Sequence, residues 1–131
     1  MKEEARRLLE KAGRALHAAE TLAGAGDAEF AAGRAYYAML HAAQSLLREK
    51  NQRYRKHAGV HSAYGEHFAR TGTLDPKFHR WLLAAFNTRL KGDYDIEADI
   101  DIDTAKEMIE HAHEFLQTAR QWLEKQVSEE R

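Results

Sequence analysis

The chain has 131 residues, a formal net charge of -1 at pH 7 and no cysteine, and 44% of its residues are hydrophobic. This length supports one domain with its own core, over residues 1–131, and excludes disulfides and thiolate metal sites. The near-neutral charge means that any contact with nucleic acid must be local. Because no apolar run approaches the roughly 20 residues that span a bilayer, and the charged start is unlike a signal peptide, we expect a cytoplasmic protein.

Helical spacing dominates the first third of the chain. Apolar residues recur every three or four positions from about residue 2 to residue 23, which predicts an amphipathic helix. Gly24 to Asp27 interrupts this pattern, since glycine follows helices readily and Asp27 can accept N–H groups at the next helix start. So short a loop implies an antiparallel hairpin. The second helix should run to about Lys50, with an apolar stripe of Phe30, Tyr37, Leu40, Ala43 and Leu47.

The middle of the chain carries two further helical patterns. His57 to Arg70 has apolar residues every four positions and predicts a shorter helix. Asp75 and Pro76 mark another helix start, because proline is tolerated in the first turn. An aromatic stripe follows them and leads to Arg89, where we expect this helix to end.

The last third holds an acidic segment, from Asp93 to Asp103, and a final helix that starts between Asp101 and Thr104. Thr104 and Glu107 have the spacing of a capping box. With one proline and no hairpin signal, the whole sequence predicts an all-α protein: an up-and-down four-helix bundle with one additional short helix. Three residues of the acidic segment are expected to anchor it to that bundle: Ile96, Ile100 and Ile102.

Charge is distributed unevenly along the sequence. Arg48 to His57 holds five basic side chains and one acid, whereas Asp93 to Asp103 holds six acids and no base. Runs of this kind are typically solvated connectors at helix ends. We therefore interpret both as surface segments.

The candidate functional residues are two arginines with polar neighbours. Arg89 precedes Asp93 and Tyr94, and Arg34 lies beside Tyr37 on the second helix. A guanidinium fork matches a phosphate or a carboxylate, so these five residues are candidates for ligand binding. The structural alternative is an internal ion pair between Arg89 and Asp93.

Other site chemistry has little support. His57 and His61 are one helical turn apart, but the glutamate of a His-Glu-x-x-His motif and a third ligand are missing, so we expect no metal. No phosphate-binding glycine loop or nucleotide fingerprint occurs either, and we expect no cofactor. Any catalysis must then come from Arg, His, Tyr and Asp. This set suits RNA cleavage through the ribose 2′-hydroxyl, which needs a base and a cation for the phosphate.

At this point the sequence resembles a known family, the HEPN domain (higher eukaryotes and prokaryotes nucleotide-binding), in its small stand-alone prokaryotic branch. The resemblance covers nearly the whole chain. It implies a helical bundle, commonly a homodimer, that works beside a minimal nucleotidyltransferase as a toxin and antitoxin pair. The matching stretches are Gly33 to Leu47 with its Arg-Ala-Tyr-Tyr run, Lys56 to His61, His67 to Gly72, Arg89 to Tyr94 and Ala105 to Phe115.

Many HEPN proteins are metal-independent ribonucleases. Their signature is an arginine followed, after four to six intervening positions, by a histidine, and the residue directly after the arginine is polar. Arg89 matches that arginine. Leu90 stands at the polar position, and Tyr94, Asp95 and Ile96 stand where the histidine is expected, so the motif lacks its base.

Three functions therefore stay open. The first is a HEPN protein that binds a nucleotide or RNA around Arg89 and pairs with a nucleotidyltransferase. The second is a metal-independent endoribonuclease toxin, in which the catalytic residues are Arg89 and His57, the latter acting as base where the narrower branch tends to have a histidine. The third is a non-catalytic dimerisation module held by an Arg89–Asp93 pair.

Overall fold

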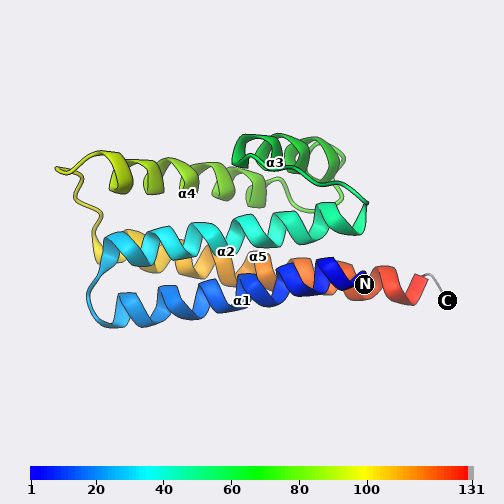
Figure 1. Cartoon of the computed structure of the whole chain (residues 1–131), viewed down its shortest axis with the longest axis horizontal. Helices are drawn as coiled ribbons and strands as arrows, with labels where there is room; N and C mark the ends of the chain where they lie inside the picture. The colour runs from blue at the N-terminus through cyan, green and yellow to red at the C-terminus, as the bar shows by residue number, and fades with distance from the viewer. Residues whose placement is uncertain (130–131) are drawn as a thin grey trace.

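The computed structural model describes residues 1–129, which form α-helices and one π-helical turn, with no strand in that range. The all-α prediction is therefore confirmed, as is a bundle of long helices with one short helix. The elements, shown in Figure 1, are α1 (Glu3–Gly24), α2 (Ala28–Glu49), α3 (His57–Tyr64), the π-helical turn η1 (Gly65–Ala69), α4 (Lys77–Tyr94) and α5 (Ile102–Glu129).

Helix α2 occupies the centre of the bundle and packs against α1, α3, α4 and α5. Helices α1 and α2 form the predicted antiparallel hairpin, α4 runs along the other side of α2, and α5 lies behind them (Figure 1). The hairpin turn is closed as the sequence indicates, because the Asp27 carboxylate accepts a hydrogen bond from the Phe30 N–H at 3.3 Å.

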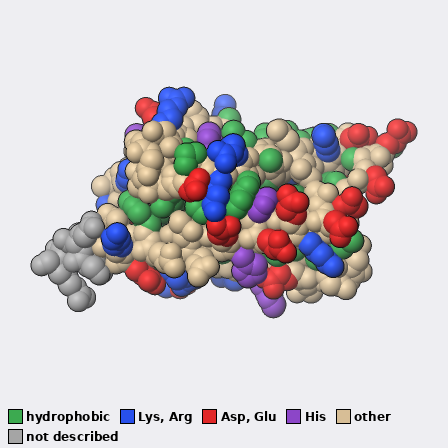
Figure 2. Space-filling view, turned by 180° about the vertical axis from the view of Figure 1, so that it is seen from behind, with side chains coloured by type: hydrophobic (Ala, Val, Ile, Leu, Met, Phe, Trp, Pro, Cys, Tyr) green, Lys and Arg blue, Asp and Glu red, His purple; other side chains and the backbone are tan. Residues whose placement is uncertain are grey.

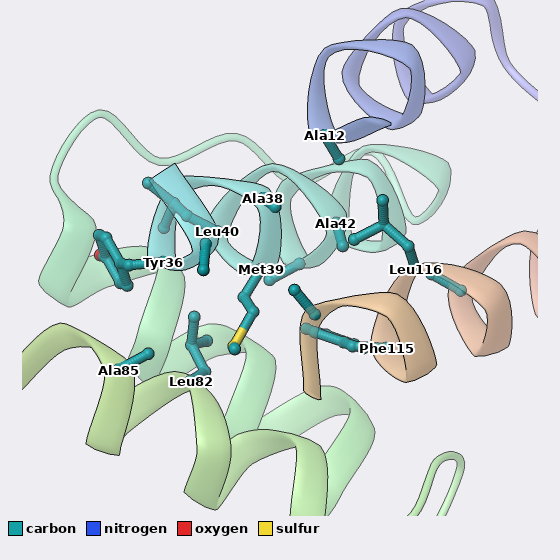
Figure 3. Close-up of a cluster of buried hydrophobic side chains, with 14 of the residues drawn as sticks. Ala12, Tyr36, Ala38, Met39, Leu40, Ala42, Leu82, Ala85, Phe115 and Leu116 are labelled. Atoms are coloured by element: carbon teal, nitrogen blue, oxygen red, sulfur yellow. The ribbon is translucent and has the colours of Figure 1, made fainter. Parts of the chain in front are cut away.

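The core forms where α2 meets its neighbours, and α2 supplies both small and large side chains to it. Its alanines are buried and let α1 and α5 approach closely, while Tyr36, Met39 and Leu40 fill the space beside α4. Figure 3 shows Met39 extending between Leu82 of α4 and Phe115 of α5. Complete burial of an aliphatic side chain of this size contributes about 1.5–3 kcal/mol.

Four details of the predicted elements are wrong. Helix α4 does not end near Arg89 but continues to Tyr94. Phe30 is 61% exposed rather than part of the apolar stripe, because the buried face of α2 carries Tyr36 instead. Ile96 is fully exposed, whereas the two other isoleucines of the acidic segment pack against the core.

The fourth correction concerns the start of α5. The Asp101 carboxylate accepts the Thr104 N–H at 2.7 Å, so Asp101 caps this helix in place of the predicted Thr104 and Glu107 box. No helix within residues 1–129 combines the length and the apolar character needed to cross a membrane.

Candidate functional site

Two consecutive tyrosines of α2, Tyr36 and Tyr37, divide the predicted polar residues and their neighbours into a buried half and an open half. Tyr36 is fully buried, and its hydroxyl oxygen lies 2.8 Å from Nε2 of His61 and 3.1 Å from Nδ1 of His57. Tyr37 is half-buried and faces the open side. Both histidines come from α3, so the hydroxyl of Tyr36 ties the first two turns of that short helix to the centre of the bundle.

Burial decides the protonation of the buried half. It raises the pKa of Tyr36 far above the usual range, so the hydroxyl keeps its proton. Burial, together with the nearby rings of His57 and His79, lowers the pKa of His61 to about 4. A single hydroxyl proton can serve one imidazole only, so the other imidazole donates an N–H to the tyrosine oxygen. At neutral pH this chain of hydrogen bonds is uncharged.

The open half gathers two guanidinium groups on one aromatic ring. Cζ of Arg34 lies 4.7 Å from the ring centroid of Tyr37, and Cζ of Arg89 lies 5.0 Å from the same centroid. The His57 ring is 5.7 Å from it. Residues from α2, α3 and α4 therefore meet at Tyr37, and Arg89 is near enough to His57 for its charge to lower the pKa of the imidazole.

The two arginines differ in their ionic partners. Nε of Arg89 is 3.0 Å from Oδ2 of Asp93 one helical turn later, and these side chains are 21% and 41% exposed. Arg34, which is exposed, forms no ion pair within the described part of the chain. The Arg89–Asp93 pair is thus formed but accessible to solvent, and partly exposed pairs contribute little to stability.

His57 has the properties of a base at neutral pH. Its burial and the charge of Arg89 lower its pKa below the ordinary value, which keeps the imidazole neutral. The ring is half-buried rather than enclosed, so it remains open to a ligand.

One predicted site residue lies apart from the cluster. Tyr94 is 81% exposed and makes no aromatic contact within residues 1–129. The reason is the length of α4: Asp93 follows Arg89 by four residues and shares its face, whereas Tyr94 follows by five and turns away. We use the name polar cluster for the side chains that do meet, which are Arg34, Tyr36, Tyr37, His57, His61, Arg89 and Asp93.

Sequence reasoning missed three residues that shape this site. Tyr36 and His61 form its buried half, and Phe86 packs on both, with ring centroids 5.6 Å and 4.9 Å away. The spacing of His57 and His61 was a usable signal, because it places both rings on one face of a helix. Both rings face Tyr36, and no group of three or more possible metal-ligating side chains occurs in the described residues.

The comparisons with known proteins span nearly the whole chain. A model of the HEPN domain matches residues 5–122. A Methanocaldococcus jannaschii protein named "Putative toxin" is 32% identical over 122 residues, covering 93% of this chain and 83% of that protein. A second protein of that organism, with the same name, is 32% identical over 94% of this chain and 91% of its own length. A Gloeobacter violaceus "UPF0332 protein" is 32% identical, covering 94% and 98%.

Proposed function

The chain belongs to the HEPN family, and from this premise we propose that it is the toxin-like HEPN component of a two-protein module and binds RNA or a nucleotide at the polar cluster. The toxin role follows from the names of the two archaeal relatives. The binding role rests on the geometry around Tyr37.

The observation that carries this proposal is the pair of guanidinium groups on the Tyr37 ring. Guanidinium groups bind phosphate oxygens in a bidentate manner, and the Tyr37 ring brings two of them together. Arg34 has no carboxylate partner among the side chains that the structure describes, so its charge is available to a phosphate without first breaking an ion pair.

Binding of a short single-stranded RNA, followed by fluorescence anisotropy, tests this proposal. We expect Arg34→Ala to weaken binding roughly tenfold through loss of a phosphate contact. The matched control is Arg120→Ala, because Arg120 is an exposed arginine on α5. If the two variants bind RNA equally well, the polar cluster is not the binding site.

A second candidate function, a metal-independent endoribonuclease, is favoured by the neutral imidazole of His57 beside Arg89. In this reaction His57 removes the proton from a ribose 2′-hydroxyl, whose oxygen attacks the adjacent phosphorus. Arg89 stabilises the extra negative charge on the phosphate. The 5′-oxygen leaves with a proton from solvent, which yields a 2′,3′-cyclic phosphate and a 5′-hydroxyl.

Incubation of the purified protein with tRNA in the presence of EDTA decides between binding and cleavage. A ribonuclease produces 2′,3′-cyclic phosphate ends, and His57→Ala abolishes them while the protein stays folded. If tRNA stays intact at a large excess of protein, the ribonuclease proposal is wrong and the binding of RNA or a nucleotide remains as the proposed function.

We further propose two partners, both implied by the family resemblance. The first is a minimal nucleotidyltransferase, which we expect to co-purify when the two genes are expressed together. The second is another copy of this chain, joined through the outward faces of α2 and α4 near the tyrosines. A monomer in light scattering at micromolar concentration contradicts that dimer. A stable dimer that binds no RNA instead supports the non-catalytic dimerisation module.

A further inference from the structure

The segment between α4 and α5, residues 95–101, forms an acidic loop with an aliphatic side chain at its surface. Ile96 is fully exposed and lies between Asp95 and Glu97. A single exposed aliphatic residue is ordinary by itself. Here, however, it stands among acids that no basic side chain within residues 1–129 pairs with, since the only ion pair in this region is the one between Arg89 and Asp93. Figure 2 shows acidic side chains gathered at this end of the molecule.

A basic cleft at the other end of the bundle has the complementary character. It has a volume of about 300 Å³ and lies between the first turns of α1, the last turns of α2 and the start of α3. Its apolar lining comes from Leu8, which is partly exposed, and from Leu47 and Val60, which are almost fully buried behind it. We call it the basic cleft because three arginines line it: Arg7, Arg48 and Arg53.

Glutamates of the first turn of α1 already pair with the arginines of this cleft: Glu3 pairs with Arg7, and one carboxylate, that of Glu4, pairs with both Arg48 and Arg53. Nε of Arg48 donates to Oε2 of Glu4 at 3.0 Å, and Nη2 of Arg53 donates to Oε1 of the same carboxylate at 3.2 Å. Two guanidinium groups therefore share a single negative charge. The Arg48 side chain is only 16% exposed, so its guanidinium is held in place at the wall of the cleft.

We propose that the acidic loop of one copy docks in the basic cleft of a second copy, with Ile96 on the apolar lining and Asp95 and Glu97 facing the arginines. The incoming carboxylates share the guanidinium groups with Glu4. The loop lies at one end of the molecule, and the helix ends that line the cleft lie at the other (Figure 1), so a loop does not reach the cleft of its own chain. Two copies related by a two-fold axis make the contact twice.

This contact is distinct from RNA binding at Tyr37, and it specifies a surface for self-association other than the proposed α2 and α4 faces. Its ion pairs are at the surface, where salt screens them effectively. Association through the loop and cleft is therefore expected to weaken as ionic strength rises.

Crosslinking tests the proposed contact directly, because the chain contains no cysteine. We would mix an Ile96→Cys protein with a tagged Tyr54→Cys protein, since Tyr54 lines the cleft and is 38% exposed. The tag distinguishes the mixed disulfide from either homodimer. The matched control replaces Tyr54→Cys by Arg120→Cys, an exposed position on α5. We expect the mixed disulfide to form with Tyr54→Cys and to disappear in high salt. Equal yields with both partners overturn the proposal.

Two substitutions that should change self-association in opposite directions provide a second test. Sedimentation velocity at several concentrations measures the self-association of each variant. Ile96→Asp is expected to weaken self-association roughly tenfold without changing the melting temperature, because Ile96 is fully exposed. Glu4→Gln removes the negative charge shared by Arg48 and Arg53 and is expected to strengthen self-association. Self-association unchanged by Ile96→Asp overturns the loop contact and leaves the dimer through α2 and α4 to be judged separately.

Discussion

Tyr36 and Tyr37 are neighbours in sequence, yet they belong to regions of the polar cluster with different roles. Tyr36 is enclosed, hydrogen-bonded to two neutral imidazoles and surrounded by the core. Tyr37 is half-buried and holds two guanidinium groups that are partly or largely exposed. One turn of α2 therefore combines a core residue with a residue of the proposed binding site. Substitutions on its two sides should separate effects on stability from effects on binding.

The largest effect is expected on the buried side. Tyr36→Ala should lower the free energy of unfolding by about 4 kcal/mol, because it removes a large core side chain and leaves buried imidazole nitrogen without its partner. Tyr37→Ala is the matched control and should cost about 1 kcal/mol, through loss of exposed cation–π contacts. Urea denaturation measures both. Similar losses for the two variants would abolish the distinction between the buried and open halves.

The second largest effect is expected from acid, which should lower the free energy of unfolding through the buried half of the cluster. The pKa of His61 is about 4 in the folded protein and about 6.5 in the unfolded chain. The unfolded chain therefore binds more protons between these values, and stability falls as the pH drops through this window. From about pH 7.5 to about pH 5 we expect a loss of about 2 kcal/mol from this group.

The control for the pH prediction is His61→Gln, which keeps a polar side chain near Tyr36 but does not titrate. Urea denaturation at both pH values should show a shallower loss for this variant. Some loss remains, because burial lowers the pKa of His57 and His41 in the same direction. An equal loss in wild type and variant would contradict the assignment to His61.

On the open side, Arg89→Ala should affect binding more than stability. We expect RNA affinity to fall roughly tenfold, while the free energy of unfolding changes by about 1 kcal/mol or less, since the Arg89–Asp93 pair is partly exposed. Anisotropy and urea denaturation give the two values. A stability loss of about 3 kcal/mol or more would instead favour the structural ion pair.

The smallest effect is expected for the carboxylate that pairs with Arg89. The sign of the change in RNA affinity shows whether this carboxylate competes with the ligand or positions Arg89 for it. Asp93→Asn removes the carboxylate that competes with a phosphate for Arg89, so RNA binding should become a few-fold tighter, within about 1 kcal/mol. Asp99→Asn is a suitable control, because it removes the same charge from the nearby acidic loop. Weaker binding in the Asp93 variant alone would mean that Asp93 positions Arg89 for the ligand.

The sequence was sufficient for the fold because periodicity and capping act locally. The break from Gly24 to Asp27 and the apolar spacing of α5 are both visible within a few helical turns of sequence. The structure agrees with both. The errors arise where tertiary packing decides. Phe30 and Tyr36 are both aromatic residues on α2, and only the positions of the neighbouring helices determine which of them is buried.

The candidate site was only partly predictable for the same reason. Arg34, Tyr37, Arg89 and Asp93 could be named because a guanidinium fork matches a phosphate or a carboxylate and both arginines have polar neighbours in the sequence. The structure brings these four residues together. The hydrogen bonds of Tyr36 depend on how α3 crosses α2, which no local pattern reveals. Tyr94 was assigned to the cluster because α4 was expected to end five residues earlier than it does.

Gly65, which is not part of the polar cluster, lies against a histidine that contacts the backbone of a cluster residue. Gly65 begins the π-helical turn after α3, and a Cβ atom there would lie 2.6 Å from Cε1 and 2.7 Å from Nε2 of His79. That nitrogen is 3.1 Å from the carbonyl oxygen of His61. One added methyl group would therefore displace a ring that supports the backbone of a cluster residue. Gly65 is thus a position from which the polar cluster can be retuned during protein engineering without altering any residue that would meet the ligand.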